Sequence, residues 1–427
     1  MTAAPGHGSG EPAAVRPVWH LTPPSGWMND PNGLLRIDGR WHAFYQHHPY
    51  SDDWGPMHWG HASSTDGLRW HHHPIALRPD EHGTIFSGSM VVDRDGAAGA
   101  GAGAWVACFT HHAEDVQHQS IAWSTDGGET WTTHPANPVI PGTVRHFRDP
   151  KVRRLPDGRF HMVTTLGDRI ACHRSDDLVR WEPAGTITAA VDGAGGMWEC
   201  PDLVVGSDGS WWLVVSLSTG AADGHSNTVA MPLDGDGTTL AHAVADAVLS
   251  AGAPRPLDHG PDWYAAQSFT EHPPVAAGSV PVVMAWMNSW RYAALLPSAG
   301  WRGVQSLPRG VDLTRSGWVQ RPAVRPVPNT GDGATRWVES DGDLVVRIEG
   351  HDGSATAGVR SGEAFVEREG LAVDGYAGRW SAPADGHGGH VVIVDHGSVE
   401  VFAAGGAATL SAQVFAGARP EVIVQNL

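Results

Sequence analysis

Five runs of bulky residues recur along the chain, and this recurrence constrains the fold more than any other feature of the sequence. Successive runs start 65, 54, 51 and 71 residues apart, at Gly39, Ala104, Gly158, Gly209 and Val280. A shorter element that ends in Trp, such as "STDGLRW" or "SDDLVRW", follows three of them. Helical periodicity is nearly absent, and a repeat of this length with several short strands is typical of a propeller blade. We therefore predict an all-β chain that begins with a five-bladed β-propeller.

Three of the runs are preceded by a proline that follows an acidic residue by one or two positions, always eight residues before the glycine that opens the run. The segments read "MNDPNG", "FRDPKV" and "WECPDL", so Asp30 and Asp149 hold the same position and Glu199 stands one residue earlier. The innermost strands of a propeller line its central channel. The three carboxylates are therefore expected to converge at one end of that channel. For Glu199 this requires a bulge or a strand end, because one residue along a strand normally reverses the side chain.

Converging carboxylates have two main uses in proteins. They bind a hard cation such as Ca²⁺ through oxygen ligands, or they hydrolyse glycosides as a nucleophile and an acid. The three acids stand singly along the chain rather than in a dense oxygen cage, which favours the glycosidase. The tryptophans that flank the acids would suit a sugar site. They are Trp27, Trp54, Trp59 and Trp198.

Composition excludes several other classes. The chain has 28 basic and 46 acidic side chains and a formal net charge of −18, which disfavours nucleic acid and anionic membranes as partners. Its three cysteines are widely spaced and signal neither a disulfide framework nor a zinc site. We expect no metal and no other cofactor. The first residues, "MTAAPGHGSGEPAAVRP", contain no apolar core of a signal peptide, so we expect a cytoplasmic protein.

Two local features and two other propeller classes offer alternatives to this interpretation. The run His71–His73 is interpreted as a solvent-facing blade edge, and Cys200 as a small buried hydrophobe rather than a reactive thiol. The segment "STDGGETW" also fits sialidases and sugar-binding propellers without catalysis. A sialidase needs a tyrosine nucleophile, and the chain has only five tyrosines. A lectin has no need of a matched acid and nucleophile.

Several motifs in order resemble glycoside hydrolase family 32, the invertase, inulinase and levanase family. The signature-like stretch "HLTPPSGWMNDPNG" at 20–33 is followed by "FYQHHP", "WGHASSTDGLRW", "FSGSMV", "FRDPKV" and "WECPDL". Later segments, "DWYAAQSF", "AWMNSWRYA" and "GWRGVQSLPR", are more similar to the exo-acting fructan hydrolases than to the sucrose-6-phosphate hydrolases. The stretch "VVIVDHGSVEVFAAGGAATLSAQVF" near the end resembles the closing strands of the family's C-terminal β-sandwich.

The resemblance implies a five-bladed propeller followed by a β-sandwich. We place the catalytic propeller at residues 1–320, a linker at 321–334 and a short sandwich at 335–427. By resemblance Asp30 is the nucleophile, Glu199 the acid/base, and Asp149 the residue that binds fructose hydroxyls and stabilises the transition state. The residues implied to shape the pocket for a terminal fructose are Asn29, Gln46, Trp54, Phe86, Ser87, Arg148 and Trp286.

The activity implied is a retaining exo-β-fructosidase that acts on small carbohydrates. Its expected substrates are short levan- or inulin-type fructans, with sucrose as a second substrate. A strict sucrose invertase and a fructosyltransferase are the alternatives within the family, and a non-catalytic sugar-binding propeller is the alternative from another class. Residues 217–235 lack the aromatic side chains usual on the leaving-group side, so the substrate is the least determined part of this prediction.

Overall fold

The structure is a computed structural model. It describes residues 15–114, 116–142, 144–189, 196–219, 224–235, 239, 242, 247–272, 279–326 and 333–426. The described residues are almost entirely β-strands, which agrees with the all-β prediction. Two 3-10 turns accompany them, η1 (Ala293–Leu295) and η2 (Ala404–Gly406). Within the described ranges there is no helix long and apolar enough to cross a membrane.

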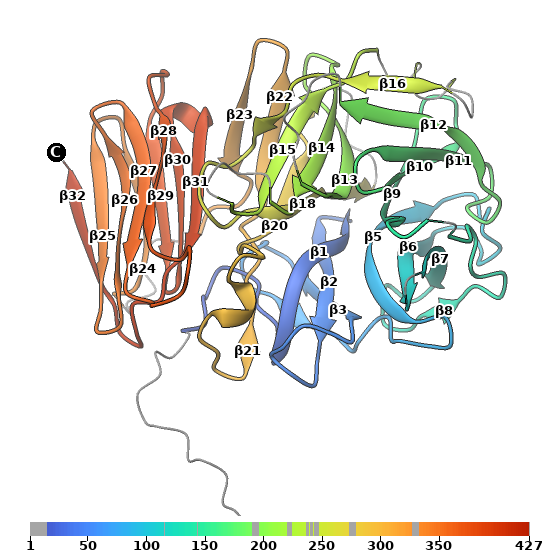
Figure 1. The fold of residues 1–427 in the computed structure, drawn as a ribbon, viewed down its shortest axis with the longest axis horizontal. Helices are drawn as coiled ribbons and strands as arrows, with labels where there is room; N and C mark the ends of the chain where they lie inside the picture. Colours follow the sequence, from blue (N-terminus) through green and yellow to red (C-terminus); the bar gives the residue numbers. More distant parts are fainter. Residues whose placement is uncertain are drawn as a thin grey trace, which may run out of the picture.

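Five sheets of the described chain form the blades of a propeller (Figure 1). Blade 1 contains β1 (Gly26–Ile37), β2 (Arg40–His48), β3 (His58–Ser64) and β4 (His71–His72), with β19 (Thr270–His272) and β21 (Trp301–Arg302) pairing β1. Blade 2 contains β5 (Thr84–Asp93), β6 (Ala104–Ala113), β7 (Val116–Ser124) and β8 (Thr132–Thr133). Blade 3 contains β9 (Arg148–Arg154), β10 (Phe160–Thr165), β11 (Ile170–Ser175), β12 (Glu182–Ala189) and β16 (Val248–Ala251).

Blades 4 and 5 complete the propeller. Blade 4 contains β13 (Trp198–Val205), β14 (Trp211–Leu217), β15 (Asn227–Pro232) and β17 (Arg255–Pro256). Blade 5 contains β18 (Tyr264–Ser268), β20 (Val282–Trp286), β22 (Arg309–Thr314) and β23 (Gly317–Pro322). The first strand of each blade contacts the first strand of the next, in the closed order β1, β5, β9, β13, β18 and back to β1. These five strands are therefore the inner strands that surround the channel.

Apolar side chains fill the spaces between neighbouring blades. Separate buried clusters join blades 1 and 2, 2 and 3, 3 and 4, 4 and 5, and 5 and 1. Many of the 20 tryptophans contribute to them, such as Trp105 between blades 1 and 2 and Trp212 between blades 4 and 5. The tryptophan-rich composition thus reflects flat, bulky side chains that fill the wedges between blades.

Two further sheets pack face to face beside the propeller and form the β-sandwich (Figure 1). One contains β24 (Thr335–Ser340), β29 (His390–Asp395), β30 (Ser398–Ala403) and β31 (Ala408–Gln413). The other contains β28 (Gly378–Pro383), β27 (Glu363–Glu369), β26 (Ser354–Arg360), β25 (Leu344–Glu349) and β32 (Glu421–Asn426). Of the predicted linker at 321–334, residues 327–332 lie outside the described residues.

Buried ion pairs join the propeller to the sandwich, and each of the two domains contributes one arginine to them. Arg309 of β22 binds Glu400 of β30, with the Nε–Oε2 distance at 2.9 Å. Arg368 of β27 in turn binds Asp262 of the propeller, with 2.5 Å between Nη1 and Oδ2. His20, in the segment before β1, lies 2.8 Å from both Asp395 and Glu400. All six side chains are buried.

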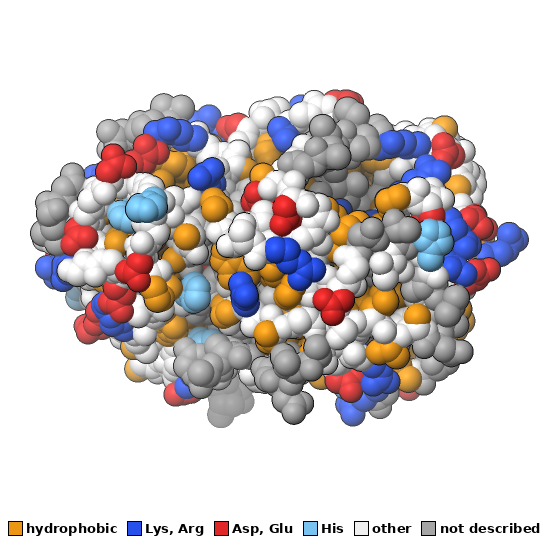
Figure 2. All heavy atoms as spheres, turned by 90° about the horizontal axis from the view of Figure 1, so that it is seen from above, with side chains coloured by type: hydrophobic (Ala, Val, Ile, Leu, Met, Phe, Trp, Pro, Cys, Tyr) orange, Lys and Arg blue, Asp and Glu red, His pale blue; other side chains and the backbone are white. Residues whose placement is uncertain are grey.

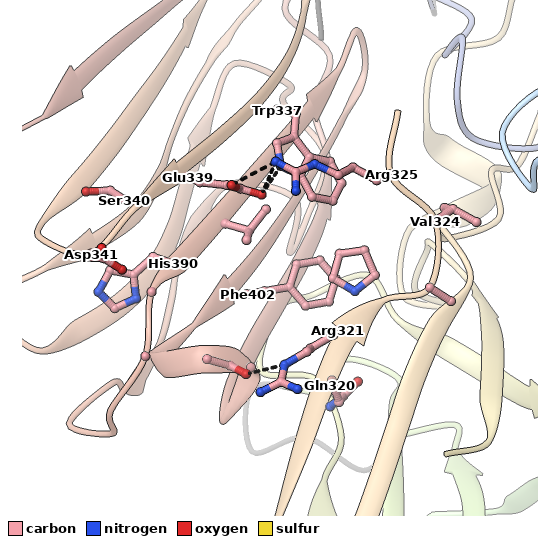
Figure 3. Close-up of a pocket in the computed structure, with 17 residues that line it drawn as sticks. Gln320, Arg321, Val324, Arg325, Trp337, Glu339, Ser340, Asp341, His390 and Phe402 are labelled. Atoms are coloured by element: carbon pink, nitrogen blue, oxygen red, sulfur yellow. Dashed lines mark hydrogen bonds and ion pairs between the residues drawn. The ribbon is translucent and has the colours of Figure 1, made fainter. Parts of the chain in front are cut away.

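A cavity of about 660 Å³ also lies between β23 and the sandwich (Figure 3). Arg325 lies over the ring of Trp337 at 5.7 Å and pairs with Glu339 at 3.0 Å. Arg321 donates to the backbone oxygen of Gly405 across the same gap, at 3.3 Å. On the outside of the molecule, acidic and basic side chains are interspersed over the face seen in Figure 2.

The prediction that His71–His73 form a solvent-facing blade edge holds for their place but only in part for their exposure, because His71 and His72 form β4, the outermost strand of blade 1. His71 is exposed, but His72 and His73 are half-buried. The ring of His73 stacks on that of His61 at 4.2 Å, and its Nδ1 lies 2.8 Å from Glu129 of blade 2. The run therefore belongs to the contact between blades 1 and 2, because its last ring fills space there.

Candidate active site

Each inner strand of the propeller carries an irregularity at the same end of the channel. The pairing register shifts between Met28 and Pro31 in β1 and between Phe86 and Gly88 in β5. Equivalent shifts lie opposite Asp149 in β9, between Glu199 and Asp202 in β13, and between Tyr264 and Gln267 in β18. A bulge bends a strand and redirects its side chains. The five bulges therefore turn short polar segments of all five blades toward one site.

The bulges account for the one-residue offset of Glu199. The residues just before the prolines, Asp149 and Cys200, both have left-handed backbone conformations, with φ of 60° and 49°. Ala265 occupies the corresponding place in blade 5 with φ of 55°. Cys200 thus holds the position that Asp30 and Asp149 hold in their blades, and Glu199 corresponds in register to Asn29 and Arg148. The predicted convergence does not require all acids to share one register.

Asp30 is held by neutral donors from two blades. Ser87 of β5 donates to Asp30 Oδ2 at 2.7 Å, and Asn29 Nδ2 donates to Asp30 Oδ1 at 2.9 Å. Asn29 is oriented in turn by Trp27, whose Nε1 donates to Asn29 Oδ1 at 2.8 Å. The side chain is buried, with 9% of its surface exposed. These contacts fix the carboxylate in one orientation without supplying a countercharge.

Glu199 is held by a cation and a phenol. Arg148 Nη2 donates to Glu199 Oε1 at 2.7 Å, and the Tyr264 hydroxyl donates to Glu199 Oε2. The Arg148 Nε also lies 3.8 Å from Asp149 Oδ2. The Glu199 side chain is 20% exposed, whereas that of Asp149 is only 6% exposed. Glu199 is therefore the most accessible of the three carboxylates.

Cys200 connects the acids. Its backbone N–H donates to Asp149 Oδ2 at 2.9 Å, and its Sγ lies 3.4 Å from Asp30 Oδ2 and 3.7 Å from Asp149 Oδ2. Burial and the surrounding negative charges raise the pKa of its thiol well above the usual value, so the sulfur stays protonated. The interpretation of Cys200 as buried and unreactive is confirmed by its burial, and the structure adds that it contacts both aspartates.

The acids are close enough to perturb one another's ionisation. Burial raises the pKa of Asp30, against the hydrogen bonds from Ser87 and Asn29 that stabilise the charged form. Burial is also the main cause that raises the pKa of Asp149 to about 7; the positive charge of Arg148 opposes this shift, and the negative charges of Glu199 and Asp30 add to it. The cluster therefore retains a proton at acidic pH, a property that general acid catalysis uses.

The structure brings the remaining predicted pocket residues to the same end of the channel in different ways. Gln46 of β2 lies opposite the bulge at Asn29 and Asp30, since its neighbours pair with Pro31 and Met28. Its side chain is buried, and Nε2 has no hydrogen-bond partner among the described residues. Trp54 is 48% exposed and meets the ring of Phe86 edge-on at 5.9 Å.

Trp286 does not face solvent. It is fully buried and packs against Trp27, Tyr264 and Trp290, with ring centroids 4.8–6.4 Å apart. Trp290, which the sequence did not single out, is 36% exposed and stacks with Trp27 at 6.2 Å. Trp286 therefore supports the aromatic wall from behind, and Trp290 is the tryptophan of this group that a ligand can reach.

The idea that four tryptophans flank the acids as sugar-facing surfaces is wrong for three of them. Trp27, Trp59 and Trp198 are at most 2% exposed. Trp59 donates its Nε1–H to the backbone oxygen of Phe86, and Trp198 packs between blades 3 and 4. Adjacent residues on a strand point to opposite faces, so a tryptophan next to a channel residue is directed into the blade packing.

Sequence reasoning missed Tyr264, which binds Glu199 directly. The signal was present, because Tyr264 stands immediately before Ala265 just as Glu199 stands before Cys200. Blade 5 lacks the proline that marks this place in blades 1, 3 and 4, so the register comparison did not extend to it. Across the described ranges, no group of three or more His, Cys, Asp or Glu side chains is arranged to hold a metal ion.

Known proteins are similar to this chain in sequence and in fold. Residues 20–322 match the Glycosyl hydrolases family 32 N-terminal domain, and residues 368–424 match the Glycosyl hydrolases family 32 C terminal. A levanase of Bacillus subtilis is 42% identical over 310 residues, which cover 70% of this chain and 45% of the levanase. An extracellular exo-inulinase of Aspergillus niger is 33% identical over 342 residues, or 70% of this chain and 62% of the relative. The chain thus spans about half to three fifths of the length of these relatives.

Two solved structures match nearly the whole chain. The β-fructofuranosidase of Schwanniomyces occidentalis complexed with fructosyl-erythritol has a TM-score of 0.82 and 26% identity, covering 96% of this chain and 93% of that one. The exo-inulinase of Aspergillus awamori has a TM-score of 0.80 and 27% identity, covering 96% and 94%.

Proposed function

We propose that this chain, which belongs to glycosyl hydrolase family 32, is a retaining exo-β-fructosidase. The observation that carries the proposal is the pairing of two differently held carboxyl groups at one end of the channel. Asp30 is oriented by neutral donors, whereas Glu199 is more accessible and lies on Arg148 and Tyr264. A glycosidase of the retaining type needs such a pair, one group as nucleophile and the other as acid and then base.

In the proposed reaction the Asp30 carboxylate attacks the anomeric carbon of a terminal β-fructofuranosyl unit. Glu199 gives its proton to the departing glycosidic oxygen, so that the bond to the leaving sugar breaks as the ester to Asp30 forms. Glu199 then takes a proton from water, which attacks the anomeric carbon and releases fructose with the original configuration. Two inversions at one carbon give net retention.

Asp149 has a different proposed task. Its position between Arg148 and the Cys200 backbone leaves it buried beside both reacting groups. We infer that it accepts hydrogen bonds from fructose hydroxyl groups, which strengthen as positive charge develops on the ring in the transition state. Asn29 and Ser87 would keep the Asp30 carboxylate in line with the anomeric carbon, and Gln46 offers an uncommitted amide to the sugar.

The proposed substrates are short levan- or inulin-type fructans, with sucrose as a second substrate. Support comes from the names of the relatives, a levanase at 42% identity and an exo-inulinase at 33%. A relative named invertase, from Debaryomyces hansenii, is 35% identical and keeps sucrose hydrolysis as the second candidate. Transfer of fructose to a second sugar is the third candidate, because the same ester to Asp30 can react with a hydroxyl group other than water.

Timed digests of levan, inulin, kestose and sucrose, analysed by chromatography, test this proposal. We expect free fructose as the first product from every fructan, with sucrose hydrolysed as well. Turnover of sucrose alone would establish the invertase instead, and growing oligosaccharides would establish the transferase. Binding of fructans without any product would show a non-catalytic propeller and overturn the proposal.

A further inference from the structure

A second large cavity lies at the opposite end of the propeller channel. It has a volume of about 1060 Å³, and the final residues of the inner strands line it: Val92 of β5, Arg153 and Arg154 of β9, and Val205 of β13. Asp149 and Glu199, by contrast, are the second residues of β9 and β13, at the other end of these strands. Since the same strands run from one end to the other, the cavity and the candidate active site open on opposite faces of the propeller.

Buried side chains close the channel between the two sites. Lys151 Nζ lies 3.0 Å from Asp202 Oδ2 and donates to the Ser268 backbone oxygen at 2.7 Å. Ser268 N–H in turn donates to Asp202 Oδ2 at 2.7 Å. Lys151 and Asp202 are at most 3% exposed. A ligand in the second cavity therefore does not reach the three carboxylates.

The side chains that close the channel, here called the closing group, are Lys151, Asp202 and Arg153, and they leave a positive charge toward the cavity. Arg153 Nη2 lies 3.4 Å from Asp202 Oδ1 and 2.6 Å from Ser268 Oγ, so Asp202 is shared between Arg153 and Lys151. The Nε of Arg153 is buried without a hydrogen-bond partner among the described residues. Two cations against one carboxylate give this group a net positive charge, and the Arg153 side chain is 30% exposed, so part of its guanidinium can meet an anion. Asp208 also lines the cavity, but its carboxylate already accepts hydrogen bonds from the Ser210 hydroxyl and the Arg315 N–H.

The rim adds further basic groups, and the walls are largely apolar. Arg154 binds Asp95 at 2.6 Å, while Arg94 is exposed at the end of β5 and has no ion pair in the described part of the chain. The apolar side chains that line the cavity come from blades 2 to 5, and they include Val91, Val152, Phe160, Trp211, Phe269 and Val282. The volume exceeds what a single inorganic ion needs.

We propose that this cavity binds a small organic anion. Its phosphate or carboxylate group pairs with Arg153 and Arg94, and its apolar or aromatic body lies against the apolar walls. The site is separate from the fructose pocket and stands whether or not the chain hydrolyses fructosides. Arginine recognises both anionic groups through paired N–H donors, whereas an apolar wall selects a body that a free inorganic ion lacks.

Isothermal titration of the full chain with phenyl phosphate and with phenylacetate tests the proposal and separates the two head groups. We expect one molecule of at least one probe to bind per chain, more tightly than inorganic phosphate. Binding should weaken with added salt and stay unchanged in saturating fructose. Heat from neither probe at millimolar concentrations, or displacement of the bound probe by fructose, would overturn the proposal.

Three variants place the bound probe. Arg153→Gln should weaken binding at least ~10-fold, because it removes the charge-assisted contact. Arg94 is exposed and not part of the closing group, so Arg94→Glu tests the site even if Arg153→Gln fails to fold. Arg94→Glu should also weaken binding ~10-fold. The matched control is Arg180→Gln. The Arg180 side chain is 90% exposed on the outer part of blade 3, so this variant should bind the probe as the wild type does. Equal affinity in Arg94→Glu and the control would contradict this location.

Discussion

Two regions of the molecule bury carboxylates, and they treat the negative charge in opposite ways. At the channel end, burial raises the pKa of Asp30 and raises that of Asp149 to about 7. Between propeller and sandwich, Glu400 is equally buried, yet Arg309 and His20 overcome the effect of burial and lower its pKa to about 2. Carboxyl groups thus have a raised pKa in one place and a lowered pKa in the other.

The difference lies in the partners. Asp30 receives hydrogen bonds from the neutral side chains Ser87 and Asn29, and Arg148 is divided between two carboxylates. Glu400, by contrast, accepts from both Arg309 and His20. A fully paired charge stabilises one arrangement of the domains. A carboxylate whose charge is incompletely compensated keeps its pKa near the pH at which an enzyme works.

Removal of Asp30 should have the largest effect on activity and little effect on the fold. Asp30→Asn retains the shape but not the nucleophile, so kcat on kestose should fall ~10³-fold or more. Urea unfolding should show no loss of stability, because a buried and poorly compensated charge has been removed. Asp176→Asn, at a carboxylate 77% exposed on blade 3, is the matched control and should retain wild-type turnover. Near-normal kcat in Asp30→Asn would exclude the proposed nucleophile.

Removal of Arg309 should reverse this pattern. Arg309→Met leaves Asp258 buried without its cation and Glu400 with His20 as its remaining cation, which should cost ~3–5 kcal/mol of unfolding free energy. The kcat per folded molecule should stay close to that of the wild type, since Arg309 touches none of the three channel-end acids. Arg321→Met, an exposed arginine at the same interface, should change stability by less than ~0.5 kcal/mol. Equal stability of both variants would show that the buried pairs contribute little.

His20 should make the interface sensitive to alkaline pH. Burial alone would lower its pKa, but Asp395 and Glu400 raise it to about 9. Its contribution is therefore fully present below pH ~6.5 and is lost as the pH rises through 9. His20→Gln should be destabilised by ~2–3 kcal/mol at pH 6, and the gap should narrow toward pH 9.5. Urea unfolding across this range measures it, and a gap that does not change with pH would contradict a charged His20.

Replacement of Asp149 should have the smallest effect on the pH dependence of stability, and its sign should be opposite to that for His20. The folded-state pKa of Asp149, about 7, lies above the unfolded value, so the wild type loses stability from this group as the pH rises from ~4 to 7. Asp149→Asn does not titrate. Its stability relative to the wild type should therefore rise by ~1–3 kcal/mol over that interval and stay level above it. A constant difference from pH 4 to 8 would show that Asp149 is ionised throughout.

The propeller and two of its acids could be predicted because their signals are local. Strand runs and turns recur within each blade, and the constant spacing from Pro31 and Pro150 to the following glycines placed Asp30 and Asp149 in one register. The predicted role of each site residue stays a prediction, as do the domain boundaries at 320 and 335.

What the sequence did not reveal depends on contacts between distant segments. A bulge redirects the side chain of Glu199. The residue with the left-handed backbone in this bulge is Cys200, and a cysteine in the sequence does not signal such a conformation. The interface pairs join residues far apart in the chain, such as His20 and Glu400, which are separated by 380 positions. No periodicity connects them, because they meet only after two domains have folded and packed.

The stereochemistry of fructosyl transfer to methanol tests the central claim most directly. If Asp30 forms an ester that a second molecule then displaces, kestose in aqueous methanol should yield methyl β-fructofuranoside, identified by NMR before any anomer can interconvert. Asp30→Asn should yield none. Formation of the methyl α-fructofuranoside would mean a single displacement by the acceptor, and it would contradict a nucleophilic Asp30.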